Sequence, residues 1–106
     1  MARVLAIAPD LFFASKIDGT LRAAGHDVTI VSWVEGPMPN DPEVVIVDLD
    51  NTDWGAGLPT GAPTLGFYSH VDVETRRRAE EAGFDLVVPR SRMAREMPAL
   101  VEGLLG

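Results

Sequence analysis

The chain has 106 residues, 46% of them hydrophobic and none of them cysteine, and its formal net charge is −7. This size predicts a single domain over residues 1–106, and the acidic balance argues against a nucleic-acid-binding surface. The lack of cysteine excludes disulfides and thiolate zinc sites, and Pro9 and Asp10 interrupt the apolar N-terminal residues, which argues against a membrane span. We therefore expect a soluble cytoplasmic domain.

The first third of the chain predicts two strands on either side of one helix. RVLAIA at residues 3–8 is an apolar strand pattern, and Asp10 is a favourable N-cap for the helix that follows. Gly25 is a typical residue just beyond a helix C-terminus, and residues 28–33 predict a second strand rich in β-branched side chains. The apolar stripe of the helix is expected to comprise Phe13, Ile17, Leu21 and Ala24.

The most apolar run of the sequence leads directly into its densest group of carboxylates. Residues 44–47 are four successive branched apolar residues, which predict a strand buried on both faces, and Asp48, Asp50 and Asp53 follow. Ligands of parallel sheets gather at the carboxyl ends of the strands, so this group could form a functional site. Equally, Asp48 and Asn51 could simply end the strand through side-chain-to-backbone turns.

Strands and helices also alternate in the second half of the chain. Residues 64–68 and 86–88 predict a fourth and a fifth strand, and a helix is expected between them, capped by Asp72. Pro98 would kink the last helix unless it lies in the first turn. The alternation predicts an α/β fold with a five-stranded parallel sheet. The apolar stripe of the last helix is expected to comprise Met93, Met97, Leu100, Val101 and Leu104.

Three stretches resemble the receiver domains of response regulators, the chemotaxis-type branch of flavodoxin-like folds. They are PEVVIVDL at residues 42–49, PTLGFYSH at 63–70 and RRRAEEAGFDLVVPRS at 76–91. The resemblance implies a three-layer, doubly wound sheet with strand order 2-1-3-4-5. It also implies that Asp48 matches the aspartate that accepts a phosphoryl group in that family.

The resemblance further implies that the residues around the phosphate acceptor have changed. The two acidic residues that would hold Mg²⁺ fall on Ala8 and Pro9, with Asp10 one position later. The switch threonine or serine falls on Tyr68, and the lysine falls on Arg90. Because Mg²⁺ and a fixed cation neutralise the oxygens during phosphoryl transfer, these changes imply a pseudo-receiver with no metal and no cofactor.

The candidate site is Asp48 with its neighbours, and no residue is assigned a catalytic role. Arg90 is expected to pair with Asp48 or Asp50, although it could instead bind an anion together with backbone amides near Ser69. His70 could act in proton transfer or as a pH switch, or could simply end the strand. The neighbours of Asp48 in this site are Asp10, Asp50, Tyr68, Ser69, His70 and Arg90.

One face of the predicted sheet has too few helices. The loops at 33–44 and 49–62 are short and rich in glycine and proline, so the second and third helices of a receiver should be shortened or missing. Both helices belong to the same face. Unless four apolar side chains fold over that face, we expect a self-association or protein-docking surface there. Those side chains are Trp33, Met38, Trp54 and Leu58.

The leading hypothesis is a stand-alone, atypical receiver-like signalling or protein-interaction module, which is not an enzyme and is not phosphorylated by the usual Mg²⁺-dependent route. One alternative is a response regulator of a two-component system that is phosphorylated on Asp48, with Asp10 shifted into a metal-binding role. Another is a flavodoxin-like domain that binds a small molecule, in which Trp33 and Trp54 stack on a ring.

Overall fold

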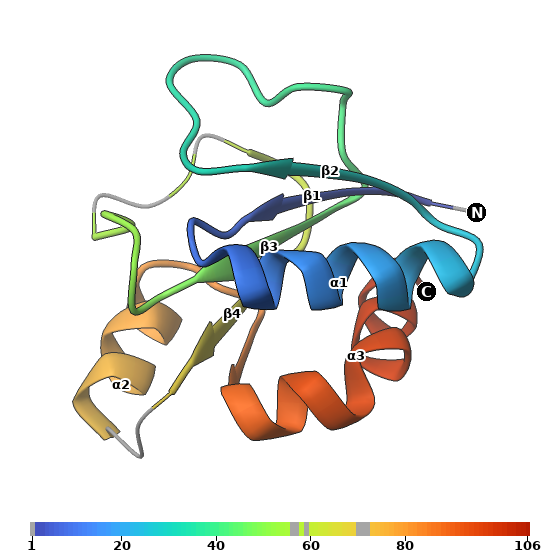
Figure 1. Cartoon of the computed structure of the whole chain (residues 1–106). Coiled ribbons are helices and arrows are strands. Elements are labelled where there is room, and N and C mark those ends of the chain that lie inside the picture. The colour runs from blue at the N-terminus through green and yellow to red at the C-terminus, as the bar shows by residue number, and fades with distance from the viewer. Residues whose placement is uncertain (1, 56–57, 59, 70–72) are drawn as a thin grey trace.

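A parallel sheet of five strands, in the order β2-β1-β3-β4-β5, forms the centre of the computed structural model, which describes residues 2–55, 58, 60–69 and 73–106. All neighbouring strands pair in parallel, so their carboxyl ends lie at one edge of the sheet (Figure 1). The predicted fold class and strand order are confirmed. The strands are β1 (Arg3–Ile7), β2 (Asp27–Val31), β3 (Val44–Asp48), β4 (Thr64–Tyr68) and β5 (Leu86–Pro89).

In the described part of the chain, three helices flank the sheet: α1 (Leu11–Ala23), α2 (Val73–Glu81) and α3 (Arg90–Leu105). Asp10 caps α1 as predicted, and Gly25 follows its C-terminus with a φ of +92°, a conformation that glycine adopts without a Cβ clash. Within α3, Glu96 leaves the helical conformation two residues before Pro98, so the predicted kink is present. No helix in the described part of the chain is long and apolar enough to cross a membrane.

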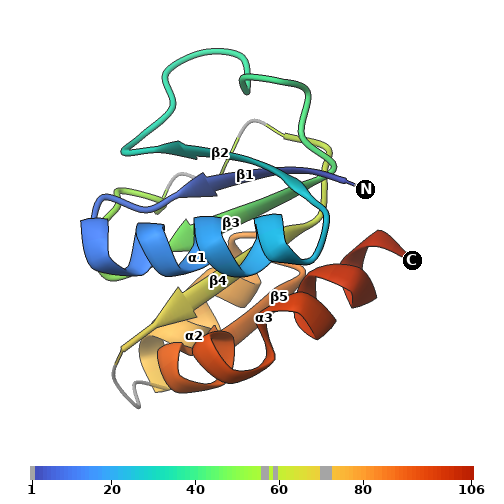
Figure 2. The same cartoon turned by 45° about the vertical axis from the view of Figure 1, so that its right-hand side comes forward.

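The helices are divided unequally between the two faces of the sheet. α1 and α3 lie side by side on one face, and α2 lies on the other (Figure 2). Between β2 and β4, the described residues contain no helix, which confirms that the second and third helices of the receiver pattern are missing. β2 also ends two residues earlier than predicted, which leaves Trp33 in the following loop.

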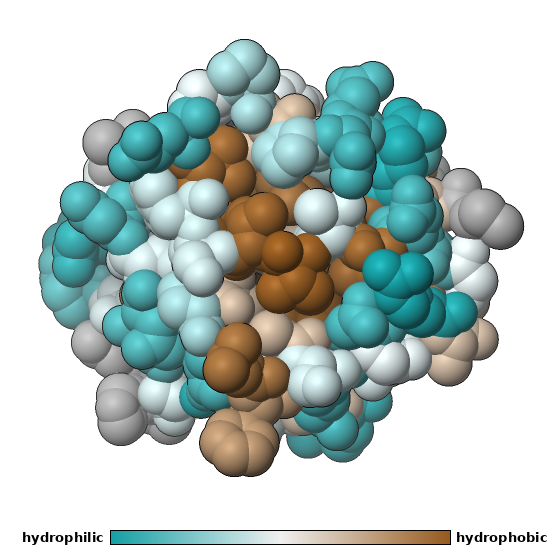
Figure 3. Space-filling view, turned by 45° about the horizontal axis from the view of Figure 1, so that its top comes forward, coloured by the Kyte–Doolittle hydropathy of each residue, from teal (hydrophilic) through white to brown (hydrophobic). Residues whose placement is uncertain are grey.

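Loop residues cover much of the face that carries α2. Trp54 is buried there, and Met38 and Leu58 are half-buried against the same apolar cluster. Trp33 does not join them and is 38% exposed. Figure 3 shows apolar surface bordered by hydrophilic groups on the side that carries β2 and the loop after it. In that region Val31 and Val34 are partly buried against the apolar cluster of the α2 face, whereas Ile30 packs against the cluster on the other face.

Candidate functional site

Asp48 is the last residue of β3, and the residue is only 1% exposed. Oδ1 accepts a hydrogen bond from the Asp50 backbone amide at 3.0 Å, and Oδ2 accepts one from the Asn51 side-chain amide at 2.7 Å. The Thr52 hydroxyl donates to the Asp48 carbonyl at 2.6 Å. Of the two roles left open by the sequence, the local one is therefore present, because both carboxylate oxygens hold the turn that ends β3.

Arg90 pairs with Asp10, so the predicted pairing with Asp48 or Asp50 is wrong. Arg90 Nη2 lies 2.5 Å from Asp10 Oδ2, and both side chains are about 29% exposed. The reason is the side of the sheet on which Arg90 lies. As the first residue of α3, it is on the face covered by α1, where Asp10 caps that helix.

Two aromatic rings fix the position of the Arg90 guanidinium. Its Cζ lies 4.5 Å from the centre of the Phe13 ring and 6.0 Å from that of Phe67. The two rings are themselves in contact, with their centres 4.7 Å apart. The quadrupoles of the two rings favour a cation at this position, so the rings and the Asp10 carboxylate together hold the Arg90 guanidinium.

The hydrogen bond from Arg90 lowers the pKa of the Asp10 carboxyl below its ordinary value of 3.8. Partial burial acts in the opposite direction, and the amides of Phe13 and Phe12 lower the pKa further. Asp10 Oδ1 accepts hydrogen bonds from both amides, at 3.5 and 3.0 Å. Both oxygens of this carboxylate are therefore committed to protein donors.

The remaining predicted neighbours are only partly brought together. Asp50 Oδ2 accepts a hydrogen bond from the Ser69 backbone amide at 2.7 Å, which links the ends of β3 and β4. Tyr68 is buried in the apolar cluster on the α2 face, so its side chain is part of the core. His70 lies outside the described residues, as does the predicted helix cap Asp72.

The residues at this edge do not fit the Mg²⁺ site of the receiver pattern. Ala8 and Pro9 have no side-chain oxygen, and the carboxylates of Asp10 and Asp48 already accept hydrogen bonds on both oxygens. No group of three or more acidic or histidine side chains that could hold a metal is present within the described ranges. Mg²⁺ requires several hard oxygen ligands in near-octahedral geometry, which these side chains do not offer.

The two tryptophans do not form a joint stacking site. Trp54 donates its Nε1 hydrogen to the Leu49 carbonyl at 2.9 Å, and its ring meets Phe84 edge to face with centres 5.7 Å apart. The Arg78 guanidinium lies 5.2 Å from the Trp54 ring centre. Trp54 is thus fully engaged in packing, which removes the support for a ring-binding slot shared with Trp33.

A set of exposed apolar residues lies around this edge, and of these only Trp33 was predicted from the sequence to be part of a docking surface. Leu11 and Phe12 in the first turn of α1 are 81% and 92% exposed, and Val73 at the start of α2 is 77% exposed. Trp33, in the loop after β2, also belongs to this set, which we call the apolar rim. The signal in the sequence was the position of Leu11 and Phe12 off the apolar stripe of the helix.

Solved structures similar to this chain include receiver domains of response regulators. The non-phosphorylated receiver domain of HemR from Leptospira biflexa matches with a TM-score of 0.79 and 17% identity, over 100% of this chain and 95% of that one. A CheY-like response regulator from Mesorhizobium loti matches with a TM-score of 0.77 and 17% identity, over 97% and 98% of the two chains. A CheY-like response regulator receiver domain protein from Methanospirillum hungatei matches with a TM-score of 0.79 and 15% identity, over 99% of this chain and 94% of that one.

The chain therefore has the receiver fold over its whole length, as the resemblance in its sequence implied. No family model matches the sequence, and no curated protein does. At these identities the structural likeness establishes the fold, and the role of the site has to be argued from its own residues.

Proposed function

We propose that this chain is an atypical receiver-like module that acts through protein interaction, without enzymatic activity and without Mg²⁺-dependent phosphorylation. The observation that carries this proposal is the state of Asp48. Its carboxylate is buried, and both oxygens are hydrogen-bonded within the turn that ends β3. A phosphoryl acceptor needs an oxygen that can be approached in line, and Asp48 does not present one.

The charges around Asp48 also support this proposal. Phosphoryl transfer depends on cations that neutralise the transferring oxygens. Arg90, the residue at the position of the receiver lysine, is bound to Asp10 and stacked on Phe13. Drawing it toward Asp48 would break a charge-assisted hydrogen bond and leave Asp10 without its partner.

Incubation with acetyl phosphate and Mg²⁺, followed by intact-mass analysis, tests this part of the proposal. We expect no phosphoryl adduct on the wild-type chain. The matched control is Asp48→Asn, which has nearly the same shape and lacks the nucleophilic carboxylate. An adduct that forms on the wild type and is absent from the variant would establish Asp48 as a phosphoryl acceptor and overturn the proposal.

The apolar rim supports the protein-interaction part of the proposal. Its members Leu11, Phe12, Trp33 and Val73 lie in segments that follow β1, β2 and β4, at the edge that carries the paired Asp10 and Arg90. Several large exposed apolar side chains at one edge of a small domain support a surface that binds protein. We propose that this rim, together with the exposed Trp33 beside the loop-covered α2 face, binds a second copy or another protein.

Light scattering over a range of protein concentrations tests self-association through this rim. We expect the mean mass to rise with concentration, and Phe12→Ser to abolish the rise because that side chain contributes the most exposed apolar ring. Ser15→Ala, on an exposed part of the same helix, is the control and should behave as the wild type. A strict monomer at the highest concentration would contradict self-association and leave another protein as the partner.

A further inference from the structure

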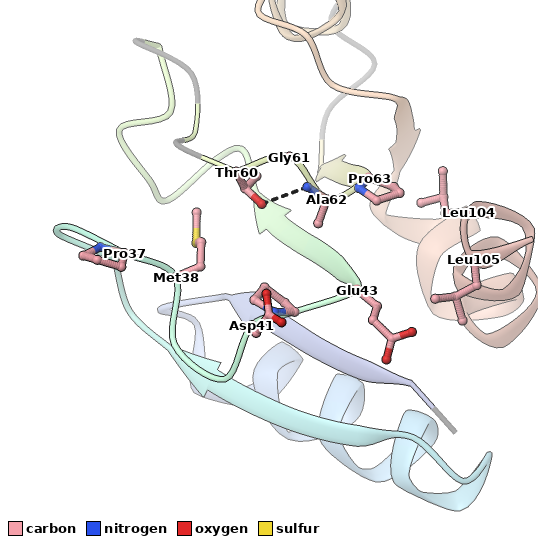
Figure 4. Close-up of a pocket in the computed structure, with 11 residues that line it drawn as sticks. Pro37, Met38, Asp41, Glu43, Thr60, Gly61, Ala62, Pro63, Leu104 and Leu105 are labelled. Carbon is pink, nitrogen blue, oxygen red and sulfur yellow. Dashed lines mark hydrogen bonds between the residues drawn. The ribbon is translucent and has the colours of Figure 1, made fainter.

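An open hollow lies at the opposite edge of the sheet from Asp48. It measures about 650 Å³ and is bordered by the loops that precede β3 and β4 and by the last turn of α3. Figure 4 shows Pro37, Met38 and Asp41 on one side, Thr60 to Pro63 across from them, and Leu104 and Leu105 at one end. We call this hollow the edge cavity. It shares no residue with the candidate site or the apolar rim.

The wall of the edge cavity offers acceptors and few free donors. Pro37, Pro42 and Pro63 have no backbone N–H at all. The Ala62 amide already donates to the Thr60 hydroxyl oxygen at 3.0 Å. A ligand that brings its own hydrogen-bond donors therefore suits this wall better than one that brings acceptors.

The charges at the cavity also favour a ligand that carries hydrogen-bond donors, and a cationic one in particular. Asp41 and Glu43 line it, and Arg3 is the cation paired with them, at 3.9 Å from the Asp41 carboxylate and 3.4 Å from that of Glu43. One arginine beside two carboxylates leaves a net negative charge. The C-terminus of α3, which has no basic residue in its last turn, adds the partial negative charge of its unpaired carbonyls.

The acidic side of the cavity is also held in a defined conformation. Asn40 and Asp41 have φ angles of +61° and +48°, two successive non-glycine residues in the left-handed region. The Asn40 side chain donates to the Thr29 hydroxyl at 2.6 Å, and Arg3 Nε donates to the Asp41 carbonyl at 2.9 Å. These bonds fix the backbone of the loop, so that the exposed Asp41 side chain projects from a defined position before any ligand binds.

From this combination we propose that the edge cavity binds a short segment of a partner protein in which an arginine or lysine is flanked by aliphatic residues. The aliphatic side chains would pack on Met38, Leu104 and Leu105, and the cation would meet Asp41 and Glu43. A guanidinium or ammonium group supplies the donors that the wall lacks. This goes beyond the function proposed above, because it assigns a second interface with a different partner chemistry.

Amide NMR titrations with three tripeptides test the proposal: acetyl-Leu-Arg-Leu-amide, acetyl-Leu-Gln-Leu-amide and acetyl-Leu-Glu-Leu-amide, at about 0.15 M salt so that distant charges are screened. We expect saturable shifts of the Asp41, Glu43, Gly61 and Leu105 amides with the arginine peptide. Binding of the glutamine and glutamate peptides should be weaker by about tenfold or more. Ethylguanidine alone should bind more weakly than the peptide, because it lacks the aliphatic contacts.

Matched charge variants separate the cavity from the overall acidity of the chain. Asp41→Asn combined with Glu43→Gln should weaken binding of the arginine peptide by about tenfold. Asp53→Asn combined with Glu80→Gln removes the same charge from exposed sites outside the cavity and should change little. The amide spectra also report whether each variant is folded. Equal binding of the three peptides, equal effects of the two double variants, or no shift at these amides up to about 5 mM peptide would overturn the proposal.

Discussion

On one face of the sheet, α1 and α3 provide the cover, whereas on the other face α2 shares that role with the loops after β2 and β3. Ile46 and Val47 are neighbours in β3 that point to opposite faces, and both are completely buried. The sheet is therefore shielded from solvent on both faces, although one face lacks two of the helices of the receiver pattern. The loops close it with single large side chains, of which Trp54 is the most deeply buried.

The difference between the faces lies in how the cover is fixed. A helix fixes its apolar stripe through its own backbone hydrogen bonds, whereas a loop has to be fixed by side-chain bonds. Trp54 meets this need with its hydrogen bond to the Leu49 carbonyl, and Asp48 holds the turn in between. Asp48, which matches the phosphoryl acceptor of the receiver pattern, thus helps to fix the loop cover here.

The largest effect should come from removing the loop cover. Trp54→Ala should lower the free energy of unfolding by about 3–5 kcal/mol, because it deletes a buried ring and leaves a cavity. Met97→Ala, which truncates a fully buried residue of the helix-covered face, should cost about 2–5 kcal/mol. Urea unfolding measures both. A cost below about 1 kcal/mol for Trp54→Ala would show that the loop cover is dispensable and would contradict the view that loops replace the missing helices on that face.

Close packing under the loop cover predicts the next largest effect. A Cβ at Gly66 would lie 2.9 Å from Leu49 Cδ1 and 3.1 Å from Phe84 Cδ2, both in buried side chains. Gly66→Ala should therefore cost about 1–3 kcal/mol through overpacking. The control is Gly19→Ala in α1, where an added Cβ would meet no atom within 4 Å outside the backbone of its own helix. This substitution should stabilise the chain by up to about 1 kcal/mol, because alanine has the higher helix propensity. The same sign for both variants in urea unfolding would contradict this account.

The turn at Asp48 should contribute less. Asn51→Ala removes the donor to the buried Asp48 Oδ2 and should cost about 1–2 kcal/mol. If the two side chains act together, Asp48→Asn and Asn51→Ala should be non-additive by at least about 0.5 kcal/mol in a double-mutant cycle. Strictly additive costs would mean that the hydrogen bond does not hold the turn.

The pairing of Asp10 with Arg90 predicts a pH-dependent contribution on the helix-covered face. The pKa of Asp10 is lowered in the folded chain, so its contribution to stability is complete above the ordinary value of 3.8 and is lost as the pH falls through the lowered value. The stabilities of the wild type and Asp10→Asn should therefore converge in acid and separate toward neutral pH. A constant difference between them in urea unfolding from neutral to acid pH would contradict the pairing.

A smaller effect than at Trp54 is expected at Trp33, the one expected cover residue that is 38% exposed. Trp33→Ser should lower the free energy of unfolding by less than Trp54→Ala does, because part of the Trp33 ring is already in contact with solvent. It should nevertheless weaken the concentration-dependent rise in mass measured by light scattering. A large loss of stability would place Trp33 in the cover together with Trp54.

Local signals in the sequence determined much of the fold. The β-branched run of β3, the Asp10 cap and the stripe from Phe13 to Leu21 depend on local geometry and were found as predicted, whereas Ala24, the last predicted stripe residue, is exposed and β2 ends early. The strand order followed from the resemblance to receivers, and the missing helices from glycine and proline in the two loops. Asp48 was placed correctly at the end of β3, with its role left open.

Only the tertiary structure decided which charged and aromatic groups meet. Arg90 and Asp10 are 80 residues apart, and their pairing depends on α1 and α3 lying on the same face of the sheet. The burial of Trp54 and the exposure of Trp33 depend on how each loop returns across the strands. Contacts of this kind are set by the packing of distant elements, for which the sequence between them carries no local periodicity.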